Sequence, residues 1–154
     1  MTKLEEGDKA PYFKGISQEG NEIKLTDYKN KKLVLYFYPK DNTPGCNDEA
    51  CNLRDNYTEF IKLGYEILGI SPDNEKKHQK FIEKFNLPFN LIADTEKEIS
   101  IAYGVWGEKK LYGITHMGIK RTTFLIDENG NIEKIFKKVK TKEHSEQIFK
   151  EIKL

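Results

Sequence analysis

Long apolar runs, cysteine and net charge are all scarce in this sequence. No apolar run approaches the roughly 20 residues of a membrane helix, and residues 1–6 lack the apolar stretch of a secretory signal. A cytoplasmic protein without membrane contact is therefore expected. The net charge of +1 removes the broad basic surface used in non-specific nucleic-acid binding, so no nucleic-acid partner is expected. The two cysteines, Cys46 and Cys51, are too few for a disulfide framework, so a bond between them would serve chemistry.

The aromatic and apolar content is nevertheless that of a folded protein. The chain has 9 Phe, 8 Tyr and 37% hydrophobic residues, which is too aromatic for a disordered sequence. A chain of 154 residues buries roughly two thirds of its unfolded surface, so its core needs neither disulfides nor a structural metal. No repeat or Gly/Ser-rich linker divides the sequence. We expect one domain spanning residues 1–154.

The order of apolar patterns predicts an α/β fold. The predicted strands are 12–17, 22–25, 33–38, 65–71, 89–92, 122–127 and 132–139. The predicted helices are 44–63, ended by Gly64 as a C′ residue, one after Asn74 that bears Phe81, Ile82 and Phe85, a short one at 96–103, and a last one with Ile148, Phe149 and Ile152. Parallel strand and helix units followed by a hairpin and a terminal helix fit a thioredoxin-like fold best. Its mixed central sheet is flanked by helices, with an N-terminal β-hairpin extension.

The densest chemical signal lies where the strand 33–38 gives way to the long helix. Thr43 is a good N-cap and Pro44 suits the first helical position, so Cys46 falls in the first turn. Backbone N–H groups there lack intrahelical partners and favour an anion. The carboxyl end of a strand is also where α/β proteins place their sites. The spacing therefore predicts a site for a thiolate at Cys46.

The two arginines stand out because the other 24 of the 26 basic residues are lysines. A guanidinium fork holds an anion in a fixed geometry that an ammonium does not supply. Arg121 opens the strand 122–127, and we expect it to approach Cys46 across the sheet. The alternative is a salt bridge from Arg121 to Asp127 or Glu49. Arg54 lies eight residues beyond Cys46, too far along a helix that rises about 1.5 Å per residue, and is expected in a salt bridge or behind the site.

The spacing of the two cysteines carries a conditional prediction. Residues five apart on one α-helix have Cα atoms about 8.6 Å apart, whereas a disulfide needs them within about 7 Å. If Cys46 and Cys51 pair, the first turns of the helix must unwind. Such a change is expected where a cysteine reacts with an oxidant in a folded site and a neighbour then resolves it.

Five segments carry a resemblance to a known family. They are YPKDNTPGC at 38–46, EAC at 49–51, LRD at 53–55, GVWGEKK at 104–110 and GIKRTTFLID at 118–127. Together they closely resemble the peroxiredoxin Q subfamily of the peroxiredoxins, whose members are also named bacterioferritin comigratory proteins. The resemblance runs from about Gly7 to near the C-terminus. A second cysteine five residues after the first is particular to this subfamily.

The resemblance implies a thioredoxin-like fold and thiol-dependent reduction of hydrogen peroxide and organic hydroperoxides, in antioxidant defence and without metal or organic cofactor. Cys46 would be the peroxidatic cysteine, which becomes a sulfenic acid. Cys51 would resolve it as an intramolecular disulfide. Thioredoxin or a similar dithiol protein would then reduce the disulfide. Members of the subfamily are commonly monomers, so a monomer is expected.

The resemblance also implies roles for the residues around the thiol. Thr43 would hydrogen-bond the peroxide, and Arg121 would stabilise the thiolate and the transition state. The residues expected to shape the substrate pocket are Pro39, Pro44, Gly45 and Glu49. Among these, Glu49 would assist proton handling or helix unwinding. Residues 100–112 resemble the loop of the subfamily that carries a tryptophan, here Trp106.

The residues leave two other functions open. A thioredoxin-type disulfide oxidoreductase would be expected to show Cys-x-x-Cys, but four residues separate the cysteines here. A non-enzymatic thiol or metal-binding module would use both cysteines with His78, His116 or His144, whose spacing indicates no converging ligand set. Both alternatives rank below a thiol peroxidase.

Overall fold

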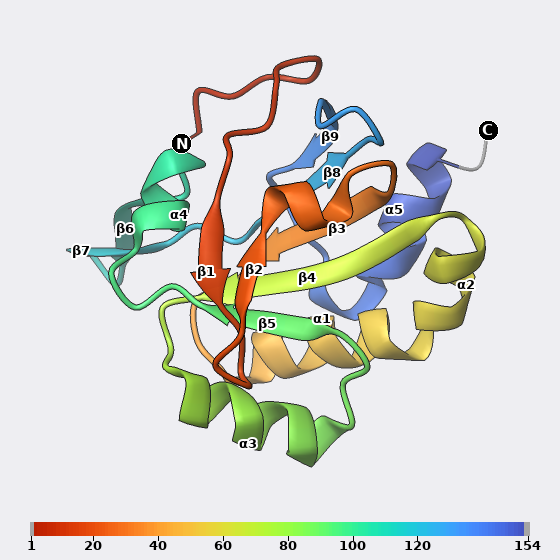
Figure 1. The fold of residues 1–154 in the computed structure, drawn as a ribbon. Coiled ribbons are helices and arrows are strands. Elements are labelled where there is room, and N and C mark those ends of the chain that lie inside the picture. The colour runs from red at the N-terminus through yellow and green to blue at the C-terminus, as the bar shows by residue number, and fades with distance from the viewer. Residues whose placement is uncertain (1, 153–154) are drawn as a thin grey trace.

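The structure is a computed structural model that describes residues 2–152 (Figure 1). Its strands are β1 Lys14–Ile16, β2 Glu22–Lys24, β3 Lys32–Phe37, β4 Tyr65–Ser71, β5 Asn90–Ala93, β6 Trp106–Leu111, β7 Ile114–Ile119, β8 Thr122–Ile126 and β9 Ile132–Phe136. Its helices are α1 Pro44–Asp55, α2 Tyr57–Lys62, α3 Glu75–Phe85, α4 Glu98–Ala102 and α5 His144–Ile152, with 3-10 turns η1 Leu25–Tyr28 and η2 Thr141–Glu143. No helix within 2–152 has the length and apolarity needed to cross a membrane.

The central sheet runs in the order β5-β4-β3-β8-β9. Strand β3 pairs parallel with β4 and antiparallel with β8, so the sheet is mixed, as predicted. In the thioredoxin-like arrangement the middle strand is covered on both faces, which explains its continuous apolar sequence. The carboxyl end of β3 leads directly into the segment before α1.

Alternating residues of β3 belong to two separate apolar clusters. Val34 and Tyr36 face the cluster that includes side chains of α1, α2, α3 and α5. Leu33, Leu35 and Phe37 face the other cluster, to which the β1–β2 hairpin and α4 contribute. Because successive side chains of a strand point to opposite faces, β3 divides the core between its two sides. Figure 1 shows the hairpin in front of the sheet and α1 and α3 below β4 and β5.

The predicted helix 44–63 is wrong in one respect, because it is two helices. Asn56 stands between α1 and α2 with a φ of −110° and a ψ of 9°, outside the helical region. Its side chain donates to the carbonyl of Asn52 at 2.8 Å, so a local side-chain bond competes with the helix ladder. The end after α2 is confirmed, since Gly64 has the positive φ of 86° that a C′ glycine adopts.

The interpretation of residues 100–112 as a loop is also wrong. Residues 106–119 form an antiparallel hairpin, β6–β7, that lies outside the central sheet. Its turn places Tyr112 and Gly113 at φ of 52° and 77°, the conformation of a tight hairpin turn. Most side chains of β7 are exposed, so the hairpin lacks the apolar alternation that predicts a strand.

Gly69 provides a test of the packing beneath the first helix. It lies on β4 between Tyr36 and Leu91, its cross-strand neighbours. A Cβ at this position would lie 2.7 Å from Leu91 Cδ2 and 2.9 Å from Tyr36 Cε1. We expect Gly69→Ala to lower the free energy of unfolding by about 1–3 kcal/mol, because the buried ring must move.

The matched control is Gly107→Ala on β6, where the added Cβ would meet only the flexible side chain of Lys120, at 3.5 Å. Its effect in urea denaturation is expected to stay within about 0.5 kcal/mol. Equal losses in the two variants would contradict the packing argument.

Candidate active site

A buried hydrogen-bond network fixes the position of the segment between β3 and α1. The hydroxyl of Tyr38 donates to Asp41 Oδ1 at 2.6 Å, and His78 Nδ1 of α3 lies 2.6 Å from Asp41 Oδ2. The backbone N–H of Asp41 donates to Asp73 Oδ2 at 2.6 Å. His78 also lies 3.0 Å from the carbonyl of Ile92 through Nε2. These hydrogen bonds fix the loop relative to the carboxyl end of β3.

The start of α1 agrees with the prediction except for the cap. Thr43 is the N-cap residue and Pro44 is the first helical residue, so Cys46 lies in the first turn. The Thr43 hydroxyl, however, donates to the carbonyl of Lys40 at 2.9 Å and makes no capping bond. The N-terminal N–H groups of α1 are therefore not occupied by that side chain, and Cys46 is buried at their level.

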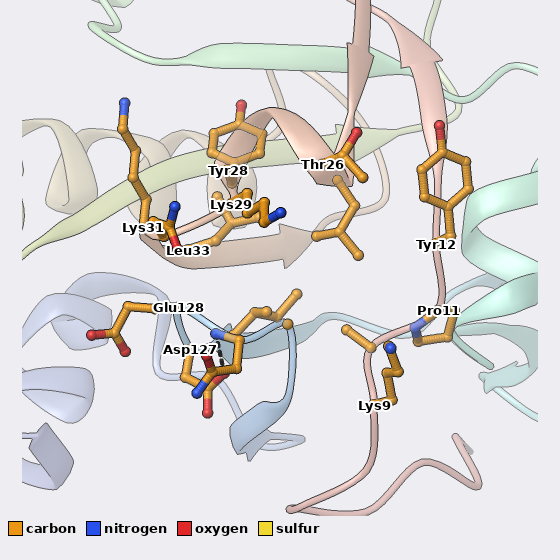
Figure 2. Close-up of a pocket in the computed structure, with 16 residues that line it drawn as sticks. Lys9, Pro11, Tyr12, Thr26, Tyr28, Lys29, Lys31, Leu33, Asp127 and Glu128 are labelled. Atoms are coloured by element: carbon orange, nitrogen blue, oxygen red, sulfur yellow. Dashed lines mark hydrogen bonds between the residues drawn. The ribbon is translucent and has the colours of Figure 1, made fainter.

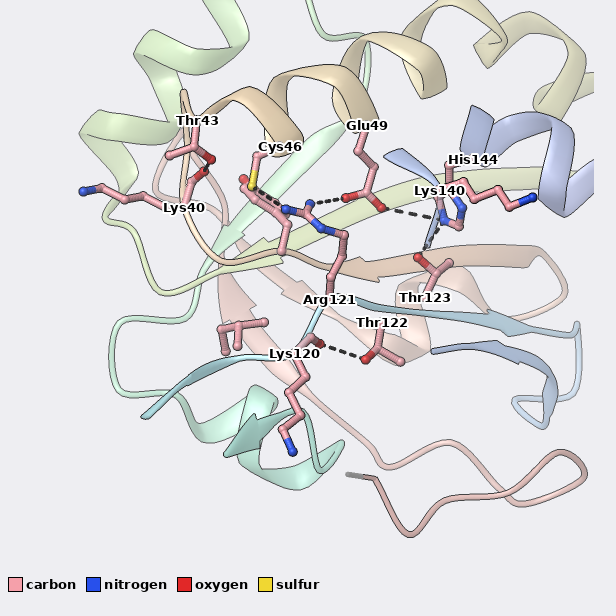
Figure 3. A network of polar contacts seen from close by, with 12 residues as sticks. Lys40, Thr43, Cys46, Glu49, Lys120, Arg121, Thr122, Thr123, Lys140 and His144 are labelled. Atoms are coloured by element: carbon pink, nitrogen blue, oxygen red, sulfur yellow. Dashed lines mark hydrogen bonds and ion pairs between the residues drawn. The ribbon is translucent and has the colours of Figure 1, made fainter. Parts of the chain in front are cut away.

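Arg121 links Cys46 to Glu49, as Figure 3 shows. Its Nη2 lies 3.4 Å from Cys46 Sγ and its Nη1 donates to Glu49 Oε1 at 2.7 Å. The pairing of β8 with β3 explains this, because Thr122 stands opposite Phe37 at the end of β3. The residue before Thr122 is thereby brought to the head of α1.

Both interactions that the sequence led us to expect for Arg121 are present. The guanidinium approaches the thiol and also forms the salt bridge to Glu49. Asp127, the other candidate for that salt bridge, instead accepts the backbone N–H groups of Asn129 and Asn131 in a turn. Gly45 leaves room for the guanidinium, since a Cβ there would lie 3.1 Å from Nη2.

Glu49 is a fully buried carboxyl group. Burial raises its pKa to about 7, although the charge and hydrogen bond of Arg121 act in the opposite direction. Its second oxygen, Oε2, has no hydrogen-bond partner among the described residues and lies 3.7 Å from His144 Nε2 of α5. Burial lowers the pKa of His144 to about 4.

Two further polar groups interact electrostatically with Cys46. The hydroxyl of Tyr36 is buried, and burial followed by the charges of Glu49 and Cys46 raises the pKa of Tyr36. Lys109 reaches in from β6 and donates from Nζ to the carbonyl of Ile119 at 2.8 Å. Burial and the neighbouring Arg121 lower the pKa of Lys109. The site thus concentrates two cationic side chains near one thiol.

Cys51 and Arg54 lie further along α1. Both cysteines are free thiols, and Cys51 is partly exposed whereas Cys46 is buried. Burial raises the pKa of the Cys51 thiol, with the charge of Arg54 acting against it. Arg54 donates to the carbonyl of Phe85 at 2.8 Å and pairs with Asp55 at 2.9 Å. Its placement away from Cys46, in a salt bridge, agrees with the prediction.

The three histidines do not converge. Within residues 2–152 no group of three or more His, Cys, Asp or Glu side chains is arranged to hold a metal ion. His116 is exposed on β7, while His78 and His144 are buried in separate networks.

A cavity of about 710 Å³ lies at the other end of β3, away from Cys46 (Figure 2). It is lined by Leu33 at the start of β3, Tyr12 and Tyr28, and by the turn at residues 127–130. Side chains of both charges, including Lys9 and Asp127, surround it. None of the residues expected at the site lines this cavity, so the chemistry is located by the thiol and its partners.

No sequence pattern marks His144 and Lys109 as parts of the site. His144 is 95 positions from Glu49 along the chain, and only the packing of α5 against α1 brings them together. Lys109 belongs to the β6–β7 hairpin, which the sequence does not predict. A lysine in a lysine-rich sequence gives no signal of its own.

Comparison with known proteins places these features in a wider context. The sequence matches the AhpC/TSA family over residues 6–135. It is 48% identical over 150 residues to Peroxiredoxin Bcp of Bacillus subtilis, covering 97% of this chain and 96% of that one. It is 43% identical over 153 residues to Peroxiredoxin Bcp of Escherichia coli, covering 99% of this chain and 98% of that one.

Solved structures show the same similarity. PrxQ of Xylella fastidiosa superposes with a TM-score of 0.92 at 32% identity, covering 99% of this chain and 98% of that one. The bacterioferritin comigratory protein of Xanthomonas campestris, studied for its alkyl peroxide reduction activity, has a TM-score of 0.86 at 34% identity, covering 92% of this chain and 90% of that one.

The raised pKa of Glu49 predicts a pH-dependent loss of stability. Between about pH 4.5 and 7 the unfolded carboxyl is ionised while the folded one keeps its proton, so the native state binds more protons and the free energy of unfolding falls as pH rises. Glu49→Gln cannot ionise. We therefore expect the free energy of unfolding of Glu49→Gln minus that of the original protein to increase by up to about 3 kcal/mol as the pH rises through this range.

The measurement is urea denaturation at a series of pH values. Because His144 titrates over part of the same range in the opposite sense, the difference between the two proteins is compared and not either curve alone. A difference that does not vary with pH would contradict the burial of an ionisable Glu49.

Proposed function

The chain belongs to the AhpC/TSA family and is a peroxiredoxin, a thiol peroxidase, and from that premise we propose which residues carry out each step. The proposal rests on one observation above all, namely that Arg121 contacts both Cys46 and Glu49 at the N-terminus of α1. Cys46 is proposed as the peroxidatic cysteine. The substrates are hydrogen peroxide and organic hydroperoxides.

In the first step Cys46 attacks an oxygen of the hydroperoxide as a thiolate. The sulfur supplies the electron pair of the new S–O bond, the O–O bond breaks, and the second oxygen takes up one proton from solvent and leaves as water or an alcohol. The sulfur is thereby oxidised by two electrons to a sulfenic acid. The guanidinium of Arg121 and the first-turn N–H groups of α1 stabilise the thiolate and the charge that develops on the leaving oxygen.

The other residues of the loop form the substrate pocket. Thr43 is partly exposed beside Cys46, and its hydroxyl is proposed to bind the hydroperoxide. Pro39, Pro44 and Gly45 shape the entrance, and Gly45 in particular admits the guanidinium. Holding the reactants in line accounts for more of the rate than thiolate formation, because a more acidic thiol is also a weaker nucleophile.

Cys51 is proposed to resolve the sulfenic acid. Its thiolate attacks the Cys46 sulfur, an S–S bond forms, and hydroxide leaves and takes up a proton as water. Since both cysteines lie on α1, this step requires the helix to unwind locally. Thioredoxin or a similar dithiol protein then reduces the disulfide, in a monomeric cytoplasmic enzyme of antioxidant defence.

Substitution of each cysteine separates the two roles. We expect Cys46→Ser to abolish peroxide turnover, because a hydroxyl is not ionised at neutral pH. Cys51→Ser should retain the fast first oxidation but stall in recycling by a dithiol protein, unless an added small thiol resolves the sulfenic acid. Stopped-flow fluorescence of Trp106 and mass spectrometry follow both steps. An equal loss of the initial step in the two variants would contradict the assignment.

Oxidation is also expected to change the helix. If a disulfide joins Cys46 and Cys51, amide protection over residues 44–53 should fall and the far-UV helix signal should decrease. Hydrogen exchange of the reduced and peroxide-treated protein measures this. Cys51→Ser treated in the same way is the control, because it forms the sulfenic acid without the disulfide. Unchanged exchange over 44–53 in the oxidised protein would exclude local unwinding.

A further inference from the structure

Asn52, the residue directly after Cys51, joins α1 to the start of α5. Its side-chain Oδ1 accepts the backbone N–H of Ser145 at 2.6 Å, and its backbone carbonyl accepts the Ser145 hydroxyl at 3.1 Å. Its side-chain Nδ2 donates to the carbonyl of Lys142 at 3.1 Å and to Glu146 Oε1 at 3.0 Å. One asparagine is therefore hydrogen-bonded to a segment that lies 90 to 94 positions further along the chain.

The contact with Ser145 satisfies backbone groups at the start of α5 and at the end of α1. The first N–H groups of a helix have no partner within that helix, and Asn52 supplies an acceptor for the N–H of Ser145. The carbonyl of Asn52 lacks the usual helical donor, because the backbone N–H of Asn56 donates to the carbonyl of Leu53 at 3.2 Å instead. The Ser145 hydroxyl and the Asn56 side chain donate to it. Ser145 is fully buried, so this contact is shielded from water.

The residues that follow Asn52 hold the same end of α1. Leu53 is fully buried in the apolar cluster shared by α1, α2, α3 and α5. Arg54 donates to the carbonyl of Phe85, at the end of α3, at 2.8 Å. Three successive residues are thus bound to α5, to the core and to α3. None of the hydrogen bonds of Asn52 and Arg54 described here involves residues 44–51, so they do not depend on that segment being helical.

The part of α1 that carries Cys46 is held by other contacts. Arg121 Nη2 lies 3.4 Å from Cys46 Sγ, and Arg121 Nη1 donates to Glu49 Oε1 at 2.7 Å. Glu49 Oε2 in turn lies 3.7 Å from His144 Nε2. The contact with sulfur weakens when the thiolate becomes a sulfenic acid, because the sulfur then carries no negative charge. Oxidation therefore loosens α1 at the end with Cys46 and leaves the bonds of Asn52 unchanged.

We propose that Asn52 is a positioning residue for the resolving step, and that it keeps Cys51 stationary while the turns that carry Cys46 open. In that step the Cys51 thiol loses its proton, its sulfur displaces hydroxide from the Cys46 sulfenic acid, and the hydroxide takes up a proton as water. Only one of the two sulfurs then has to move, so less conformational freedom is lost when the S–S bond forms. This inference rests on the proposed roles of the two cysteines and extends them.

The first test compares the two oxidation steps in Asn52→Ala after one equivalent of hydrogen peroxide. Stopped-flow fluorescence of Trp106 and mass spectrometry of quenched samples give the rate of Cys46 oxidation and the rate of disulfide formation. We expect the first rate to stay within about twofold and the second to fall by about threefold or more, because Cys51 becomes mobile. A disulfide that forms at an unchanged or higher rate overturns the proposal. An equal loss in both rates also overturns it, because that is the effect of a merely structural role.

The matched control is Asn90→Ala on β5. Asn90 Oδ1 accepts a hydrogen bond from Gln18 Nε2 at 2.9 Å, so this variant also loses an asparagine side-chain bond between distant parts of the chain. It leaves Asn52 and its partners in place, and we expect both rates to equal those of the original protein. An equally slow second step in Asn90→Ala would assign the effect to a general loss of stability and overturn the role of Asn52.

A second test uses the unaltered protein and does not depend on the folding of a variant. The Ser145 amide donates to Asn52 Oδ1, so its hydrogen exchange reports whether this bond survives oxidation. We expect the Ser145 amide to keep its protection in the peroxide-treated protein while protection over residues 44–51 falls. Loss of protection at Ser145 on oxidation overturns the proposal, because Asn52 then moves with the opening turns.

The outcomes separate the inference from the function on which it rests. If peroxide produces no disulfide between Cys46 and Cys51 in the unaltered protein, the proposed function is overturned and the inference with it. If the disulfide forms but Asn52→Ala forms it no more slowly, or if the Ser145 amide loses its protection, the inference alone is overturned.

Discussion

The contact of one guanidinium with a thiol and a carboxyl group organises this molecule. Arg121 lies between Cys46 and Glu49, and both partners are buried on one face of α1. Removal of Arg121 would leave the buried Glu49 Oε1 without its donor, so the three groups depend on one another. Around them the structure supplies what the contact needs, which is a glycine at position 45, the pairing of β8 with β3, and the first turn of a helix.

The reduced state and the proposed catalytic cycle place opposite structural requirements on α1. In the reduced state α1 must be intact, because its N-terminus faces the thiol and its buried side chains complete the core. In the proposed cycle its first turns must open so that Cys51 can reach Cys46. The helix is short and ends at Asn56, whose side chain competes with the helical ladder. Its hydrogen bonds to Ser145 of α5 are made by Asn52, beyond both cysteines, whereas Glu49 lies between the cysteines and 3.7 Å from His144.

Much of the fold follows from patterns along the chain. The central strand, the cysteine in the first helical turn and the glycine that ends α2 were all predicted, because each depends on local periodicity or on a residue with a narrow conformational preference. The segments that were predicted wrongly lack such local signals. Residues 106–119 are mostly exposed, so no apolar period marks the β6–β7 hairpin, and the break at Asn56 depends on one side-chain bond.

The sequence by itself determined which residue types are present for thiol chemistry and at what local spacing: Thr43, Cys46 and Cys51 lie on one segment, with a single distant arginine before a strand. Only the tertiary structure decided that Arg121 meets Glu49 as well as Cys46, that His144 lies beside Glu49, and that Asp41 and His78 hold the loop. These contacts join positions that are tens of residues apart, and the physical reason is that strand register and helix packing set them. No local pattern records such pairings, because each residue alone is compatible with many environments.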